Sequence, residues 1–395
     1  MPLHSRLIRF ASIAAGVTCV GGCAMNGTAG NAADAPAATT VRGGPIDTNR
    51  DLRLFGDTGT ESDVVFEGQA AASVKQHTFT VDGADFDPAL SATSEQLVFA
   101  STRHSRFSHL YRKSIDGATI TQITDARAND AQPVFNPTGQ RIAFTSDRSG
   151  NWDIWVVDAD GRNPMQVSNA LLPELHPSWS PNGRSLVYCR INPKESRGEL
   201  WVAELDHPGV RRLIGEGMFP AWSPTGAKIA YQRARQRGSR WFSIWTIDYN
   251  AGEPRFPTEI ASSPRAAMIA PAWSTDGRQI AFTAVEHDPP PAFRPADTGS
   301  DTLPTSRICI VDADGRGLQY LTDPRNESYS PSWASDDRIY FTRRLDKTET
   351  IWSVRPFRPP LPKPPVKTVD DKRSTTVTET AVGRFDGGEV RANGT

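Results

Sequence analysis

The sequence PSWSPNGRSLVY, residues 177–188, returns along the chain in near copies. It recurs as PAWSPTGAKIAY at 220–231 and PAWSTDGRQIAF at 271–282, and more loosely as PVFNPTGQRIAF at 133–144 and PSWASDDRIYF at 331–341. The leading aromatic residues of these five copies are 44, 43, 51 and 60 residues apart, and a weaker sixth copy begins 49 residues earlier, at Phe86. A period of this length indicates a repeat architecture.

Each copy predicts two short strands, A and B, joined by a Ser-Pro-x-Gly-like turn, because Pro fixes φ and Gly accepts a positive φ. A third strand, C, follows in segments such as DIWVVD at 153–158, and an Asp-Gly hairpin turn leads to a fourth, D. Four short strands about every 45 residues are typical of a propeller blade. We therefore predict an all-β, six-bladed β-propeller of four-stranded blades over residues 73–356.

The two ends of the predicted ring must meet. The sixth unit supplies strands A, B and C and then enters RPFRPPLP at 355–362, which cannot pair as a central strand. We expect QHTFTV at 76–81 to supply the missing fourth strand of the sixth blade. Such closure would couple the chain ends and remove exposed strand edges.

The repeated phrase, followed by IWVVDADG at 154–161, resembles the TolB-like, WD40-like propeller repeats of bacterial envelope proteins. The resemblance covers residues 76–356 and implies a propeller that works in the envelope. TolB proteins carry an α/β domain before the propeller, whereas this chain has a segment rich in Ala, Gly, Thr and Asn there.

The first 22 residues predict a lipoprotein signal peptide, with basic Arg6 and Arg9 before an apolar stretch from Phe10 to Val20. VGGC at 20–23 resembles the bacterial lipobox, which makes Cys23 the expected lipidation site; an ordinary secretory signal is the alternative. Ala24, in the lipoprotein pattern, implies delivery to the outer membrane. We expect a flexible tether over 23–72, a Pro-rich, disordered tail over 357–395, and a periplasmic chain held to the membrane by its N-terminal lipid.

Composition and motifs argue against several functions. The formal net charge of −1 gives no field for nucleic acid. Cys189 and Cys309 lie far apart without neighbouring metal-ligand patterns, and we expect both to be buried in strands. No nucleophile elbow, zinc-protease motif, P-loop or dinucleotide fingerprint occurs in the sequence. We therefore expect no cofactor, no metal and no catalytic constellation.

The loops between strands B and C vary most between the units, and in a propeller these B–C loops share one face with the D–A loops. Variation on one face of a rigid scaffold is typical of a binding surface. Arginine and tryptophan, which are enriched in binding hot spots, gather there. The predicted partner-binding residues are Arg106, Trp152, Arg233, Arg235, Arg237, Arg240, Trp241, Arg343 and Arg344.

An arginine near the end of strand B recurs in five units, at residues 103, 148, 190, 233 and 343. A structural pairing with a neighbouring blade is one explanation, and recognition of a ligand is the other. The opposite face collects aspartates in its turns, so the sequence predicts a basic loop face opposite an acidic one.

These patterns favour a non-catalytic module that binds an envelope protein or an acidic peptide through the basic B–C face. The alternative is a propeller enzyme, or a carbohydrate- or metal-binding propeller, that uses acidic residues and histidine at the central channel. Its candidates, which we place in D–A loops, are Glu174, His176, Glu216 and Glu327.

Overall fold

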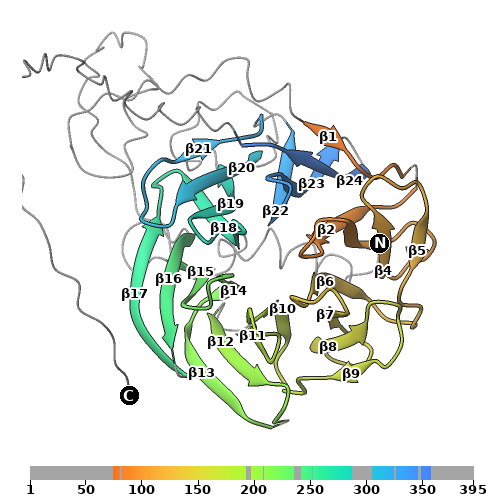
Figure 1. Cartoon of the computed structure of the whole chain (residues 1–395), viewed down its shortest axis with the longest axis horizontal. Coiled ribbons are helices and arrows are strands. Elements are labelled where there is room, and N and C mark those ends of the chain that lie inside the picture. Colours follow the sequence, from red (N-terminus) through yellow and green to blue (C-terminus); the bar gives the residue numbers. More distant parts are fainter. Residues whose placement is uncertain are drawn as a thin grey trace, which may run out of the picture. The chain divides into compact units, whose positions relative to one another are not determined.

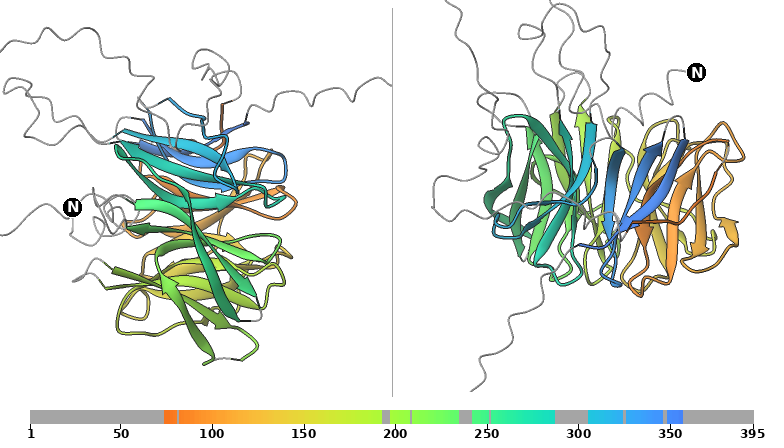
Figure 2. Two further views of the ribbon diagram at one scale, coloured as in Figure 1. Left: turned by 90° about the vertical axis from the view of Figure 1, so that its left-hand side faces the viewer. Right: turned by 90° about the horizontal axis from the view of Figure 1, so that it is seen from above.

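The computed structural model describes residues 74–80, 82–192, 197–207, 209–234, 242–250, 252–286, 305–323, 326–345 and 348–356. Over these residues the chain forms six four-stranded antiparallel sheets arranged around a common axis (Figure 1). Seen from the side, the strands run between two faces of the ring (Figure 2). The six-bladed propeller predicted from the repeat is therefore confirmed.

Blades 1 to 5 each take four consecutive strands, in the order A, B, C, D from the ring axis outward. Blade 1 is β2 Asp85–Leu90, β3 Gln96–Ser101, β4 His109–Ser114 and β5 Ile120–Gln122. Blade 2 is β6 Asp130–Phe135, β7 Arg141–Ser146, β8 Asp153–Asp158 and β9 Met165–Gln166. Blade 3 is β10 Glu174–Trp179, β11 Ser185–Asn192, β12 Arg197–Glu204 and β13 Arg211–Glu216.

The second half of the ring follows the same order. Blade 4 is β14 Met218–Trp222, β15 Lys228–Ala234, β16 Phe242–Asn250 and β17 Glu253–Ala261. Blade 5 is β18 Ala266–Trp273, β19 Gln279–Glu286, β20 Thr305–Asp312 and β21 Gln319–Tyr320. Blade 6 is β22 Glu327–Trp333, β23 Ile339–Leu345 and β24 Thr348–Val354, with β1 Lys75–Gln76 as its outermost strand.

Ring closure by the N-terminal segment is confirmed, but the strand is Lys75–Gln76, so only Gln76 of the predicted segment at 76–81 forms part of it. Lys75 pairs with Ser353 and Gln76 with Trp352 across β1 and β24. Beyond β1, the backbone N–H of Ile351 donates to the Thr78 hydroxyl over 3.0 Å. Blades 1, 2 and 5 make the same bond from strand C to Thr124, Ser168 and Thr322. The closing segment therefore takes the place of a regular strand D.

The repeated phrase packs blades together and turns corners. The Trp179 indole Nε1 donates to the Val134 carbonyl of the preceding blade over 3.1 Å, and Trp273 does the same to Ala221 over 3.0 Å. In the A–B turn, Gly183 has a φ of 69° and its N–H donates to the Ser180 carbonyl. The strand B aromatics fill the spaces between blades, and Tyr188, Phe282 and Phe341 are fully buried.

Strand A is irregular in the same way in all six blades. The residue before its proline has a positive φ of 52° to 57°, and the A–B pairing register shifts there, as in a β-bulge. The six residues are Asp87, Gln132, His176, Phe219, Ala270 and Ser330. Because strand A is innermost, the bulges bring these positions to the wall of the central channel.

The predicted signal peptide, Cys23, the tether and the Pro-rich tail lie outside the described residues. Within the described part of the chain, no helix is long and apolar enough to cross a membrane. Cys189 and Cys309 are free and fully buried, as predicted.

Candidate functional site

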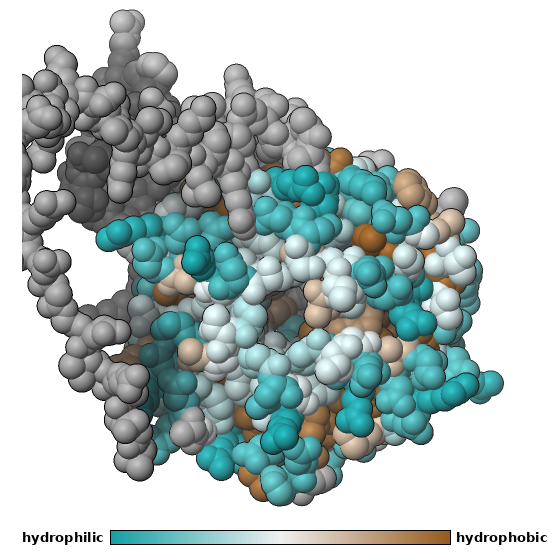
Figure 3. All heavy atoms as spheres, in the orientation of Figure 1, coloured by the Kyte–Doolittle hydropathy of each residue, from teal (hydrophilic) through white to brown (hydrophobic). Residues whose placement is uncertain are grey.

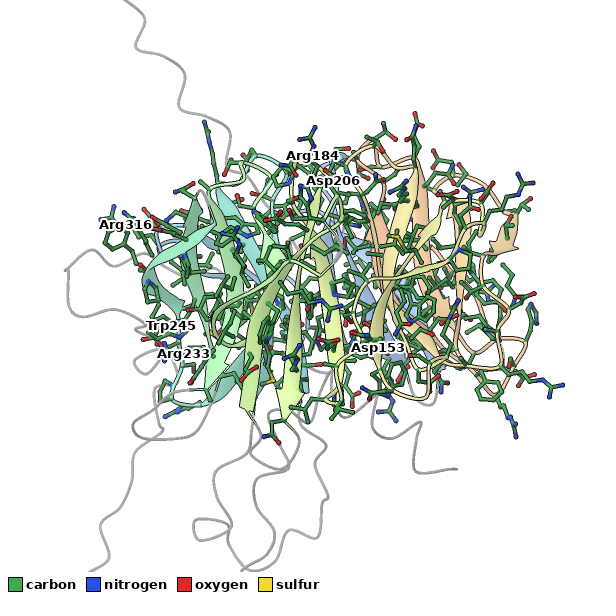
Figure 4. All side chains as sticks on the ribbon, turned by 90° about the horizontal axis from the view of Figure 1, so that it is seen from below. Asp153, Arg184, Asp206, Arg233, Trp245 and Arg316 are labelled. Atoms are coloured by element: carbon green, nitrogen blue, oxygen red, sulfur yellow. The ribbon has the colours of Figure 1, made fainter. Side chains whose placement is uncertain are left out.

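The two faces of the ring carry different segments. Figure 4 shows Arg184, Asp206 and Arg316, from the A–B and C–D turns, toward one face, and Asp153, Arg233 and Trp245 toward the other. The second face carries the B–C and D–A connections and is called the B–C face below. At its centre the ring is hollow, and in Figure 3 the residues around the opening have intermediate hydropathy.

In blades 1 to 3, the recurring arginine is held by a buried carboxylate. Arg103 bonds Asp85 over 2.8 Å, Arg148 bonds Asp130 over 2.9 Å, and Arg190 bonds Glu174 over 2.9 Å. The three acidic side chains are completely buried, whereas the arginines are 11 to 19% exposed. The guanidinium groups also lie over strand C aromatics, and Arg190 is 4.2 Å from the Trp201 ring centroid.

These arginines therefore have a structural role, but the predicted partner was wrong. Each carboxylate belongs to strand A of the same blade, not to a neighbouring blade. The reason is register: Asp85 faces Ser101, Asp130 faces Ser146, and Glu174 faces Arg190 across strands A and B. An acid three residues before the repeat proline is a sequence signal that could have identified these pairs.

Blades 4 to 6 have no acid at this position. Met218 pairs with Gln232, so the equivalent residue in blade 4 is Gly217, and in blades 5 and 6 it is Met268 and Ser328. Blade 5 instead pairs Arg307 of strand C with Glu286, and the guanidinium lies 4.1 Å from the Tyr320 ring centroid. Arg233 and Arg343 of blades 4 and 6 therefore differ from the arginines of blades 1 to 3.

The Arg233 guanidinium lies 5.3 Å from the Trp245 ring centroid, and its charge opposes the rise that burial causes in the pKa of Tyr231. Arg343 lies 4.9 Å from the Trp352 ring centroid, and burial lowers the pKa of its guanidinium, an effect that the charge of Asp323 partly offsets. Its Nε is buried without a hydrogen-bond partner in the described structure. Neighbouring Arg344 pairs with Glu327 over 3.3 Å.

Two further predicted residues are brought to the same face. Arg106 is exposed, with its guanidinium 4.8 Å from the Phe107 ring centroid. Trp152 is half-buried against the core between blades 3 and 4. Sequence reasoning missed Leu171 in the adjacent D–A loop, which is fully exposed; the Asn151 amide ties this loop to the B–C loop by donating to the Ala170 carbonyl over 2.8 Å. The apolar pair of Leu171 and Leu172 in a turn was the available signal.

The remaining predicted residues are Arg235, Arg237, Arg240 and Trp241, which lie outside the described residues, as does 287–304 of the long fifth B–C loop. Their role stays a prediction.

The channel residues do not form the cluster that the alternative function requires. Glu174, His176 and Glu327 lie in strands A and Glu216 in strand D, not in D–A loops as predicted. Glu174 is used by Arg190 and Glu327 by Arg344. Among the described residues, no group of three or more His, Cys, Asp or Glu side chains could hold a metal ion.

His176 of strand A lies beside Cys189 of strand B, but the pair does not resemble a catalytic dyad. Nδ1 of His176 is 3.3 Å from the Cys189 Sγ, and the centroids of the His176 and Phe219 rings are 3.5 Å apart, with the rings tilted by 32°. Burial lowers the pKa of His176 to about 3 and raises the pKa of Cys189 to about 12. Both groups are therefore neutral at pH 7, whereas a nucleophilic cysteine needs its thiolate.

Inter-blade hydrogen bonds start at three of the six bulge residues. The backbone N–H of Asp87 donates to Thr342 Oγ1 over 3.1 Å, that of His176 to Gln132 Oε1 over 3.0 Å, and that of Ala270 to Gln232 Oε1 over 3.0 Å. Each acceptor belongs to the preceding blade. The channel wall thus links neighbouring blades.

The opposite face is not a free acidic surface. Several aspartates counted there lie near basic residues: Arg141 is 3.8 Å from Asp158, Arg184 is 3.7 Å from Asp206, and Lys228 pairs with Asp248. Together with the pairs of blades 1 to 3, these contacts make the charge difference between the two faces smaller than the sequence predicted.

Comparisons with known proteins agree with this architecture. Residues 151–301 match the TolB β-propeller domain. A solved TolB structure from Agrobacterium tumefaciens aligns with a TM-score of 0.51 at 20% identity, over 70% of this chain and 91% of that one. The propeller of this chain is therefore similar to that of TolB proteins.

Curated relatives match over short segments. The Tol-Pal system protein TolB of Legionella pneumophila is 38% identical over 78 residues, which are 19% of this chain and 18% of that protein. The protein TolB homolog of Chlorobium luteolum is 30% identical over 93 residues, 24% of this chain and 21% of that protein. The matches thus cover about a fifth of these relatives' length.

Proposed function

We propose that the protein is a non-catalytic binding module of the bacterial envelope, held at the outer membrane by a lipid on Cys23. Its B–C face binds a protein segment of acidic character in the periplasm. Arg235, Arg237, Arg240 and Trp241 of the blade 4 loop form the centre of that surface, with Arg106 and Trp152 at its other side. The similarity to the Legionella pneumophila protein named Tol-Pal system protein TolB supports the envelope location.

One observation carries the proposal: the described part of the B–C face presents arginine next to aromatic or apolar side chains. Arg106 lies on Phe107, Arg233 on Trp245, and Arg343 on Trp352. The fully exposed Leu171 lies on the same face, in the D–A loop tied to Asn151 beside Trp152. Arginine with aromatic anchors is the composition of binding hot spots.

The test is affinity capture by the mature chain from its own envelope extract. A triple variant with Arg235, Arg237 and Trp241 replaced by Ala should lose capture of its partner at least about 30-fold, since one hot-spot residue contributes about 2 kcal/mol. The matched control replaces Arg162, Arg184 and Arg316 of the opposite face by Ala and should capture normally. Equal capture by both variants, each with an unchanged melting temperature, would contradict the proposal.

The same preparation tests the anchor. The wild-type chain should sediment with the outer membrane, and the Cys23→Ala chain should be released into the soluble periplasmic fraction. A Cys23→Ala chain that still sediments would contradict lipid anchoring at this residue.

A further inference from the structure

The repeat provides an internal comparison for blade 6. Arg190 of blade 3 and Arg343 of blade 6 occupy the same strand B position, facing Glu174 and Ser328 respectively. Both guanidinium groups lie over the tryptophan of strand C, at 4.2 Å from Trp201 and 4.9 Å from Trp352. The two sites therefore differ chiefly in the carboxylate, which blade 3 has and blade 6 lacks.

No neighbour in the described part of blade 6 replaces that carboxylate. The Ser328 side chain is fully buried, and its hydroxyl donates to the Asn326 carbonyl over 3.1 Å. Glu327 pairs with Arg344. The Nε of Arg343 is buried without a hydrogen-bond partner, and burial lowers the pKa of this guanidinium.

Blade 4 does not offer an equivalent site. Arg233 lies close enough to Tyr231 for its charge to oppose the rise in the pKa of the tyrosine. A Cβ built on Gly217, the residue at the acid position, would lie 2.4 Å from the Tyr231 ring, so the tyrosine occupies the space that a carboxylate would need.

The charge of Asp323 offsets the burial of Arg343 only in part, and no described carboxylate hydrogen-bonds its buried Nε. A partly desolvated guanidinium without a hydrogen-bonded carboxylate is unfavourable, and a carboxylate that reaches it adds a charge-assisted hydrogen bond. The planar fork of arginine matches a carboxylate, and the tryptophan below fixes its orientation.

We propose that Arg343, supported by Trp352, is a receptor site for a carboxylate of an acidic peptide segment. The peptide completes in trans the pair that Asp85, Asp130 and Glu174 complete within their own blades. This inference rests on the proposed function. It specifies the chemical group of the ligand, a carboxylate, and the blade that binds it.

The probe is a fluorescein-labelled hexaglutamate peptide, with hexaglutamine as the neutral comparison, and binding is followed by fluorescence anisotropy at low salt. The wild-type chain should bind hexaglutamate and not hexaglutamine. Arg343→Gln should weaken hexaglutamate binding by at least about tenfold. Ser328→Glu should weaken it to a similar degree, because it supplies in cis the carboxylate that Glu174 supplies in blade 3.

The matched control is Ser328→Gln, which has the same size without the charge and should leave binding within about twofold of the wild type. Ser328→Glu should also melt at a higher temperature than Ser328→Gln, because it neutralises a desolvated cation. Either variant, Arg343→Gln or Ser328→Glu, decides the question if the other fails to fold.

Two results would overturn the inference: no hexaglutamate binding by the wild type, or undiminished binding by folded Arg343→Gln or Ser328→Glu protein. Neither result touches the proposed function, which is judged by envelope capture with the blade 4 loop variant. If the blade 4 loop variant loses envelope capture while Arg343→Gln still binds hexaglutamate, the protein is a binding module, but Arg343 is not part of its site.

Discussion

The recurring arginine places its guanidinium group at the same site in blades 1 to 3, although its backbone lies at one of two positions in the repeat. Arg103 and Arg148 come 18 residues after their carboxylates, whereas Arg190 comes 16 residues after Glu174. The longer spacing places the guanidinium two residues beyond the strand B position that Arg190 occupies, yet all three lie over a strand C aromatic. The repeat conserves the location of the guanidinium, not its spacing from the phrase.

Asp87 in the channel wall carries the first prediction at this scale. Burial is the main cause that raises its carboxyl pKa to about 6, and the charge of Glu349 adds to it, while hydrogen bonds from the Ser330 hydroxyl and the Gln132 N–H oppose the shift. A folded pKa above the unfolded value of 3.8 means that the stability present below pH 3.8 is lost as the pH rises to about 6.

Asp87→Asn should therefore raise the free energy of unfolding at pH 7.5 by about 1–3 kcal/mol, since asparagine keeps an acceptor and tolerates the positive φ. The gain should disappear at pH 4, where the aspartate is largely protonated. Urea unfolding at the two pH values measures it. A variant equally or less stable than the wild type at pH 7.5 would show that the charged carboxylate of Asp87 does not destabilise the fold.

At the scale of the element, the closing segment shows how the four residues from Lys75 to Thr78 substitute for a regular strand D. Only Lys75 and Gln76 form regular β-pairs, but His77 continues the pairing by donating its N–H to the Ile351 carbonyl over 2.8 Å. The His77 ring then bonds Ser353 Oγ over 2.8 Å, and its centroid lies 4.8 Å from that of the tilted Tyr340 ring. Side-chain contacts thus complete what two backbone pairs begin.

Thr78 provides the test of this closure. Its hydroxyl accepts the buried Ile351 N–H, so Thr78→Val should lower the free energy of unfolding by about 1–3 kcal/mol, the cost of an unsatisfied buried donor. The control is Thr80→Val, because the Thr80 hydroxyl makes only an exposed bond to the Asp82 carbonyl. Deletion of residues 70–82 should lower the melting temperature further. Equal unfolding curves for the two valine variants would argue against a structural role of the segment.

At the scale of the whole molecule, two buried histidines make the ring sensitive to acid. Burial lowers the pKa of His77 to about 3, helped by the charges of Lys75, Lys113 and Arg338, and burial alone lowers that of His176 to about 3. The unfolded histidines bind protons near pH 6.5, so the stability present above pH 6.5 is lost as the pH falls toward 3. Asp87 acts in the opposite direction over part of this range.

His77→Gln should flatten this pH dependence. Below pH 6.5, each histidine lowers the free energy of unfolding by up to about 1.4 kcal/mol per pH unit, and the variant removes one of these two effects. The measurement is the free energy of unfolding in urea at pH 7.5, 6.0 and 5.0. The difference between variant and wild type should change across this series by about 1–2 kcal/mol in favour of the variant. Parallel pH profiles would mean that the wild-type His77 is protonated in the folded ring.

The sequence by itself determined the architecture, because each repeated phrase encodes the same local turn and strand pair, and six copies fix the number of blades. It also identified the closing segment, since a polyproline stretch cannot provide the last strand. These are features of local chemistry and chain order.

Only the tertiary structure decided which charges are free. Asp85, Asp130 and Glu174 neutralise three of the recurring arginines, for which the sequence left structural pairing and ligand recognition open. The pairing register that joins them cannot be read from loop composition. The register also shows that Ser328, and not an acidic residue, faces Arg343. The register of two adjacent strands decides whether an acidic and a basic side chain face each other. Register is a property of the folded sheet.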